Sequence, residues 1–206
     1  MGRNFILNKS NEEIIRNIYE QAYRTQLNYR GCSQVVVQAL MDHLNMYNQE
    51  VFRAANAFGA GIARKGRTCG ALIGALMGIG LCFGRSDLKE GGAPKEVGEI
   101  PYSTPYERTQ DLAAEMFDRF EQFWGTAECR SIQGKVLGRT MDVRDPDVKK
   151  MMESGEYFDM LSKVCCNVSA AASRMAAEII LREIEREKNW YRFDQRCDFD
   201  YKPPEK

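Results

Sequence analysis

Three glycines spaced four residues apart within an apolar run constrain the fold of this chain more than any other feature. The run extends from Ala71 to Phe83, and Gly70, Gly74 and Gly78 recur along it. Residues four apart share one side of a helix, so the missing side chains let a second backbone approach closely. Each glycine lowers helix propensity by roughly 1 kcal/mol relative to alanine. Close packing must compensate for this loss, so we expect a central, buried helix.

The composition is that of a globular chain with balanced charge. Of 206 residues, 44% are hydrophobic, and 29 Lys plus Arg are matched by 29 Asp plus Glu. This length supports one domain over residues 1–206 with a sizeable core. The chain lacks the basic field that attracts nucleic acid, so we expect no nucleic-acid partner. The longest apolar run is too short to cross a bilayer and the first ten residues lack a secretory apolar stretch, so we expect no membrane insertion and a cytoplasmic location.

Apolar residues recur at helical intervals along most of the chain, and no segment has the alternation of a strand. Ser10, Asn48 and Thr104 have the positions of helix caps. The predicted helical segments are about 11–26, 31–45, 48–58, a helix beginning beside Cys69 with Thr68 as its cap, 104–124, 126–133 and 157–188. The expected fold class is therefore all-α, a compact multi-helix domain.

Four stretches lack this helical pattern. Glycines at 59, 61 and 66 indicate a flexible loop, and residues 85–104, rich in Gly and Pro, indicate a long loop insertion. Residues 145–147 lie in a polar connection, and residues 189–206 are expected to form an irregular C-terminal tail.

Seven cysteines are widely spaced along the chain. An odd number without an export signal favours reduced thiols or metal ligands over a disulfide framework. Cys32 and Cys69 fall in the first turns of predicted helices, where the macrodipole and free N–H groups favour the thiolate. The thiolate attacks disulfides and binds metals, so Cys69 and Cys32 are the candidate catalytic residues.

Two adjacent cysteines lie in the last predicted helix. Their directions differ by about 100°, and Cys165 shares a face with Leu161 and Val168. We therefore expect Cys165 to point to the core and to be the functional member of the pair, with Cys166 as the alternative.

Four cysteine segments occur in a fixed order: Gly31-Cys32-Ser33-Gln34, Cys69-Gly70-Ala71-Leu72-Ile73-Gly74, Cys129-Arg130 and Cys165. This pattern resembles the C-GCAxxG-C-C family of redox-active proteins. The resemblance covers about residues 14–183. It implies a small all-helical protein with a joint site made of Cys32, Cys69, Cys129 and Cys165. A similar domain occurs ahead of haem modules in some cytochromes, where an iron–sulfur centre has been proposed. Cys82 and Cys197 match no family position.

Three functions fit such a site. The leading one is electron transfer through an iron–sulfur cluster, because four thiolates from separate segments are soft anionic ligands. The first alternative is a metal-free thiol–disulfide oxidoreductase in which Cys69 attacks and another family cysteine resolves. The second is a helical binding module with structural or zinc-binding cysteines, and zinc is less favoured because paired C-x2-C ligands are missing.

The partner would be a redox protein or a small-molecule substrate, and a homo-oligomer is compatible with the sequence. Arg64, Lys65 and Arg67 are expected at the surface, where they could lower the pKa of Cys69 or dock an acidic partner. The sole histidine, His43, is expected to be solvated near the end of a helix.

Overall fold

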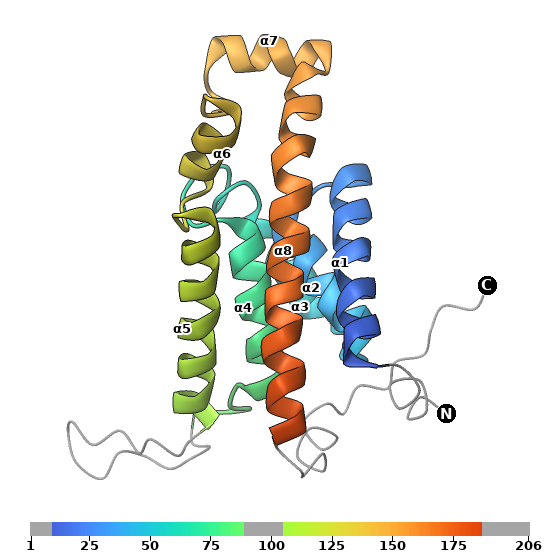
Figure 1. The fold of residues 1–206 in the computed structure, drawn as a ribbon. Helices are drawn as coiled ribbons and strands as arrows, with labels where there is room; N and C mark the ends of the chain where they lie inside the picture. Colours follow the sequence, from blue (N-terminus) through green and yellow to red (C-terminus); the bar gives the residue numbers. More distant parts are fainter. Residues whose placement is uncertain (1–9, 89–104, 187–206) are drawn as a thin grey trace, which may run out of the picture.

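Helices form the regular structure of residues 10–88 and 105–186, which the computed structural model describes (Figure 1). The prediction of an all-α fold is confirmed. The elements are α1 Asn11–Asn28, α2 Cys32–Leu44, α3 Gln49–Ala55, the 3-10 helix η2 Asn56–Phe58, α4 Gly70–Phe83, α5 Pro105–Trp124, α6 Cys129–Leu137, α7 Pro146–Ser154 and α8 Glu156–Arg186. An isolated antiparallel bridge joins Thr68 to Glu128.

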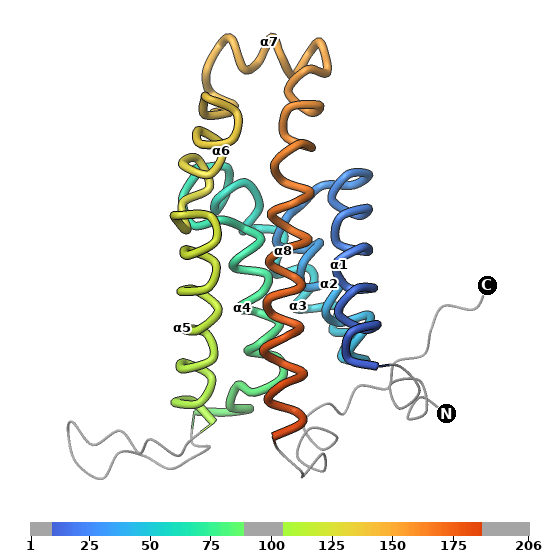
Figure 2. The backbone as a smooth tube through the Cα atoms, in the orientation of Figure 1, coloured from blue at the N-terminus to red at the C-terminus, as the bar shows by residue number. Residues whose placement is uncertain are grey.

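The long helix α8 is the element around which the others are arranged. It packs against α1, α2, α4, α5, α6 and α7. In Figure 1, α1, α4 and α5 run along α8, while α2 and α3 lie behind. Figure 2 follows the chain upward through α5 and α6, across the top in α7, and back down through α8.

The helix α8 is long and apolar enough to cross a membrane, by length and composition alone. However, 67% of its most apolar 18-residue window is buried inside the fold. These residues pack against the surrounding helices, as in the core helix of a helical domain.

The glycine row of α4 lies against α2, as predicted. A Cβ at Gly74 would come closer than 3.0 Å to the carbonyl oxygen of Ser33, and one at Gly78 would overlap Cδ1 of Leu40 in the same way. The buried hydroxyl of Ser33 donates to the carbonyl of Ala55 at 2.7 Å, and this bond joins the end of α3 to the start of α2. Because Gly74 and Gly78 lack side chains, α4 can pack this closely against α2.

Two local predictions about helix starts are confirmed. The side chain of Ser10 accepts a hydrogen bond from the Glu13 N–H at the start of α1, and Asn48 accepts one from the Val51 N–H at the start of α3. The expected cap of α4 is wrong. Cys69, not Thr68, occupies the N-cap position, and its side chain forms no capping hydrogen bond.

The helix α7 was missed in the sequence. Asp145 caps it by accepting from the Asp147 N–H at 2.9 Å, and Pro146 is its first residue. Val148 and Met151 are buried in a small second apolar cluster below it. Asp-Pro-Asp is a usable start signal, because aspartate caps helices and proline fits the first turn.

Other boundaries differ by a few residues or cannot be compared. The segment predicted at 126–133 is α6, which begins at Cys129 and ends at Leu137. Pro105 begins α5 as expected. Thr104, most of the predicted insertion at 85–104, the last two residues of the predicted helix 157–188 and the tail at 189–206 lie outside the described residues.

Replacing Gly74 by alanine tests the role of the glycine row. We expect Gly74→Ala to lower the free energy of unfolding by about 1–3 kcal/mol, because the new methyl group overlaps the rigid backbone of α2. Gly80→Ala is the matched control, since a Cβ there meets no atom within 4 Å. It should raise stability by roughly 1 kcal/mol through helix propensity. Equal stabilities of the two variants in urea denaturation would contradict the close α2–α4 approach.

Candidate functional site

A cavity of about 790 Å³ lies between the C-terminal end of α1, the segment after η2, α6 and the N-terminal half of α8. We call it the thiol cavity because it is lined by Cys32, Cys69, Cys129 and Cys165. The fold thus brings together all four cysteines that the sequence singled out.

Each of the four cysteines comes from a different element, and three lie where a helix starts. Cys32 is the first residue of α2, behind Gly31, whose φ of 87° lies in the left-handed region. Cys69 is the N-cap residue of α4, and Cys129 is the first residue of α6. Cys165 is carried by α8, which forms the opposite wall of the cavity.

Backbone pairing holds the start of α4 beside the start of α6. The N–H of Cys69 donates to the carbonyl of Ala127 at 2.8 Å, and the N–H of Cys129 donates to the carbonyl of Arg67 at 2.7 Å. These two bonds flank the bridge between Thr68 and Glu128. Cys69 and Cys129 are therefore placed side by side by main-chain contacts, although they are 60 positions apart in the sequence.

Two glycines make room for the cysteines. A Cβ at Gly70 would lie 2.5 Å from Sγ of Cys32 and 2.7 Å from the carbonyl oxygen of Phe58. A Cβ at Gly61 would lie 2.7 Å from Cβ of Cys129, and the φ of +70° at Gly61 also disfavours a side chain. The glycine after Cys69 in the motif is thus needed for the approach of Cys32.

The segment after η2 forms an ordered left-handed turn, where a flexible loop was expected. Residues 60–64 all have positive φ, between 49° and 70°. Hydrogen bonds from the Ala63 N–H to Ala57 and from the Arg67 N–H to Gly61 hold this turn. A left-handed conformation costs roughly 1–2 kcal/mol at each residue other than glycine. Strain of this kind concentrates at functional sites, and this turn lines the thiol cavity.

Burial raises the pKa of all four cavity thiols. The pKa of Cys69 lies well above its ordinary value, first because of burial and then because Cys32 and Cys129 are close by. Burial likewise raises the pKa of Cys129 to about 12. For Cys32, hydrogen bonds from the backbone N–H groups of Ala60, Ser33 and Gly70 oppose the effect of burial without overcoming it. The expectation that the helix N-terminus makes Cys69 a thiolate is therefore wrong, because desolvation dominates.

Cys165 and Cys166 differ in direction, but not as expected. Cys166 is the one that points to the core, with 0% of its surface exposed, whereas Cys165 is half-buried and faces the cavity. The charges of Cys32 and Cys129 would raise the pKa of Cys165, in addition to burial. Cys165 is therefore the member of the pair that lies with the other three cysteines.

The charged residues in the cavity lining are both arginines, Arg30 and Arg64. Among the described residues no Asp or Glu lines it. Gln133 donates to Sγ of Cys129 at 3.8 Å and accepts from the Met141 N–H at 3.2 Å. Sequence reasoning missed Arg30, Gln133 and Tyr157, which belong to no motif and reach the cavity only through the fold.

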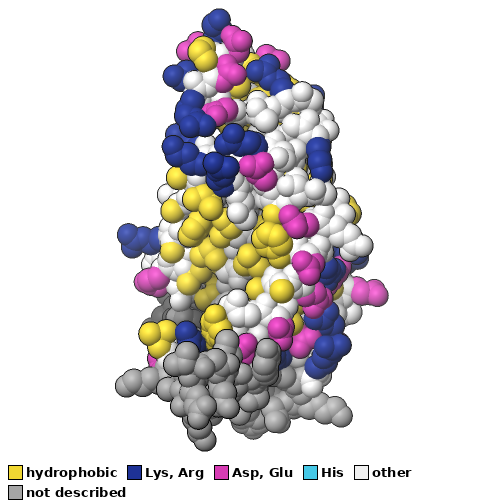
Figure 3. Space-filling view, turned by 90° about the vertical axis from the view of Figure 1, so that its left-hand side faces the viewer, with side chains coloured by type: hydrophobic (Ala, Val, Ile, Leu, Met, Phe, Trp, Pro, Cys, Tyr) yellow, Lys and Arg dark blue, Asp and Glu magenta, His cyan; other side chains and the backbone are white. Residues whose placement is uncertain are grey.

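A basic surface lies beside the segments that contain Cys69 and Cys129. Lys65, Arg67, Arg130 and Arg144, which we call the basic rim, line a surface hollow of about 460 Å³ together with Ile62. Figure 3 shows Lys and Arg side chains gathered on the upper part of the molecule, above an apolar area. Glu128 lies 3.7 Å from Arg67, and Asp142 pairs with Arg144, so the rim is only partly neutralised.

The donor set of the thiol cavity consists of four thiol sulfurs. In the described part of the chain, no three His, Cys, Asp or Glu side chains are close enough to hold one metal ion. A cluster distributes its thiolate ligands over several iron atoms, so its ligands lie further apart than those around zinc. Thiol sulfur is the ligand type that iron–sulfur clusters use, so the chemistry of these four side chains is compatible with one.

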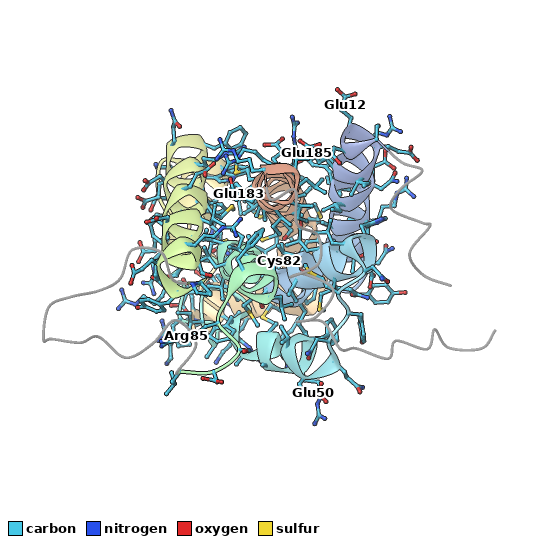
Figure 4. All side chains as sticks on the ribbon, turned by 90° about the horizontal axis from the view of Figure 1, so that it is seen from below. Glu12, Glu50, Cys82, Arg85, Glu183 and Glu185 are labelled. Carbon is cyan, nitrogen blue, oxygen red and sulfur yellow. The ribbon has the colours of Figure 1, made fainter. Side chains whose placement is uncertain are left out.

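Cys82 and the histidine do not line the thiol cavity. Figure 4, viewed from below, shows Cys82 at the lower end of the bundle, where its Sγ lies 3.3 Å from Sδ of Met46. His43 does not line the thiol cavity, and Cys197 lies outside the described residues. None of these three can be assigned to the site.

The comparisons with known proteins place the chain in a family. A sequence model described as "Putative redox-active protein (C_GCAxxG_C_C)" matches residues 31–179. No curated protein and no solved structure matches the chain. The matched range begins just before Cys32 and continues past Cys165, so it includes the whole set of cavity cysteines. The chain therefore belongs to the C-GCAxxG-C-C family of redox-active proteins.

Proposed function

We propose that Cys32, Cys69, Cys129 and Cys165 hold an iron–sulfur cluster and that the protein transfers electrons through it. The observation that carries this proposal is the convergence of four thiols, from four separate elements, on one cavity. The family supplies the redox character, and the cavity supplies a plausible ligand set.

The raised pKa values of the thiols support a metal-bound role over a metal-free one. Protonated thiols are weak nucleophiles, and burial keeps the thiols of Cys69 and Cys129 protonated at neutral pH. Bound iron would replace these protons and offset part of the thiolate charge. When bound, the cluster would supply one-electron redox chemistry.

The surroundings of Cys32 also suit an anionic sulfur ligand. The backbone N–H groups of Ser33, Ala60 and Gly70 donate hydrogen bonds to its sulfur. Donors of this kind stabilise a thiolate ligand, and they are one of the means by which proteins adjust the reduction potential of a cluster. The left-handed turn that contains Ala60 would contribute to the site in this way.

We also propose that the basic rim docks an acidic redox protein. Arg67 and Arg130 directly flank the cysteine segments, and the carbonyl of Arg67 accepts from the N–H of Cys129. A partner bound at the rim would therefore lie beside the backbone segments that carry Cys69 and Cys129. Complementary charge speeds association and orients such encounters.

Substitution of the two neighbouring cysteines in α8 tests the ligand set. We expect Cys165→Ala to lower the iron and acid-labile sulfide bound after anaerobic reconstitution by about fivefold or more, because one of four cluster ligands is lost. Cys166→Ala removes the adjacent sulfur, which faces the core, and should retain the cluster. Equal iron content in both variants, with both proteins folded by circular dichroism, would remove Cys165 from the ligand set.

Thiol alkylation separates the cluster from the metal-free alternative. In reduced, metal-free protein at about pH 7.5, we expect the cavity thiols to react with iodoacetamide at least about tenfold more slowly than in the denatured chain. The rate should rise with pH, because the raised pKa values keep the thiolate fraction small below about pH 9. Peptide mapping assigns each thiol. A Cys69 that reacts faster than free cysteine would favour the thiol–disulfide oxidoreductase.

Charge reversal tests the basic rim. Lys65→Glu combined with Arg67→Glu should weaken binding of an acidic [2Fe–2S] ferredoxin, used as probe, by about tenfold at low salt. Arg67 has 69% of its side chain exposed, and Arg24→Glu is the control, since Arg24 is 75% exposed on α1 and lies outside the rim. High salt should abolish the difference. Equal affinity of the double variant and the Arg24→Glu control would place the partner elsewhere.

A further inference from the structure

The thiol cavity is larger and more varied than a ligand set for a cluster alone requires. Its volume of about 790 Å³ lies within the range of small-molecule pockets, ~300–1,000 Å³. Besides the thiols, its lining includes the apolar side chains of Leu27, Phe158, Leu161 and Val168. A small molecule with a mainly apolar framework and few polar groups could bind in this open cavity.

The charged side chains of this lining are both positive. Arg30 and Arg64 line it without any acidic neighbour from the described residues, and neither forms an ion pair there. Tyr157 lines the same cavity as the two arginines.

The two arginines are positioned by unusual local structure. Each has a left-handed backbone, with φ of 63° at Arg30 and 62° at Arg64. The guanidinium carbon of Arg30 lies 3.6 Å from the centre of the Phe158 ring, so one face of the group is covered while its N–H edge is free to donate. Guanidinium groups held in this way bind oxyanions through paired hydrogen bonds.

The cavity lining also contains a mostly buried amide side chain. Gln26, with only 7% of its surface exposed, lines the cavity and accepts a hydrogen bond from the Ser169 hydroxyl at 3.2 Å. Because Gln26 also lines the open cavity, its amide N–H groups lie where they can donate to a ligand bound there.

We propose that the thiol cavity binds a small organic anion, with its oxyanion head group held by Arg30 and Arg64 and its apolar part against Phe158 and Leu161. The Gln26 amide and the Tyr157 hydroxyl provide further hydrogen-bond donors. Its role as a redox substrate rests on the proposed function, because the anion would then lie beside the cysteine site. Binding of the anion does not require a cluster.

The test uses two pairs of probes that differ in charge but hardly in shape, benzoate with benzamide and 2-naphthoate with 2-naphthamide. Isothermal titration with reduced, metal-free protein should give at least one carboxylate that binds about tenfold more tightly than its amide. Arg30→Gln and Arg64→Gln should each reduce carboxylate affinity by about tenfold and leave amide affinity unchanged. Arg24→Gln, on the exposed surface of α1, is the control and should change neither.

Three results would overturn the proposal. They are no binding of either carboxylate, equal affinity for carboxylate and amide, and carboxylate affinity unaffected by both cavity substitutions. If Arg30→Gln and Arg64→Gln instead shift only the reduction potential of reconstituted protein, the arginines serve the cluster and not a substrate. Because the titration uses metal-free protein, failure to form a cluster would leave its result unchanged. Conversely, a cluster-containing protein that binds no anion would retain the proposed function and lose this inference.

Discussion

The contact between the start of α4 and the start of α2 is the constraint on which the rest of the site depends. Gly74 meets the backbone of Ser33, and Gly70 lies directly against the sulfur of Cys32. A side chain at either position would separate the two helices. Because Cys69 immediately precedes this contact, the same glycines that pack the core also bring Cys32 to Cys69.

Two further attachments complete the arrangement. Main-chain hydrogen bonds join the residues around Cys69 to those around Cys129, and α8 closes the cavity with Cys165. The strained turn at residues 60–64 fills the space between these elements and directs the Ala60 N–H to Cys32. Consecutive left-handed residues lower stability, so stability alone does not explain this turn. A site that requires the Ala60 N–H and Arg64 in these positions explains it.

Local features of the fold were predictable from the sequence, and tertiary ones were not. The helix starts at Ser10 and Asn48 depend on one side chain and a nearby N–H, so they follow from residues a few positions apart. The pKa of Cys69 depends on burial by distant segments, and this burial reverses the effect expected from the helix N-terminus. The position of Arg30 in the cavity similarly depends on how α1 meets α8. The four cysteines were identified because the motifs around them resemble those of a family. Their spacing along separate helices does not determine the distances between their sulfur atoms.

The account combines a buried thiol site, a basic surface beside it and an open cavity lined by two arginines. Its central claim is that the four thiols jointly bind iron and sulfide. Mössbauer spectroscopy of protein reconstituted anaerobically with ⁵⁷Fe and sulfide tests this claim most directly. The account predicts the narrow quadrupole doublets of iron in tetrahedral sulfur coordination, whose intensity accounts for most of the bound iron. A spectrum of only oxygen-coordinated or magnetically ordered iron, from a folded and fully reduced protein, would contradict it.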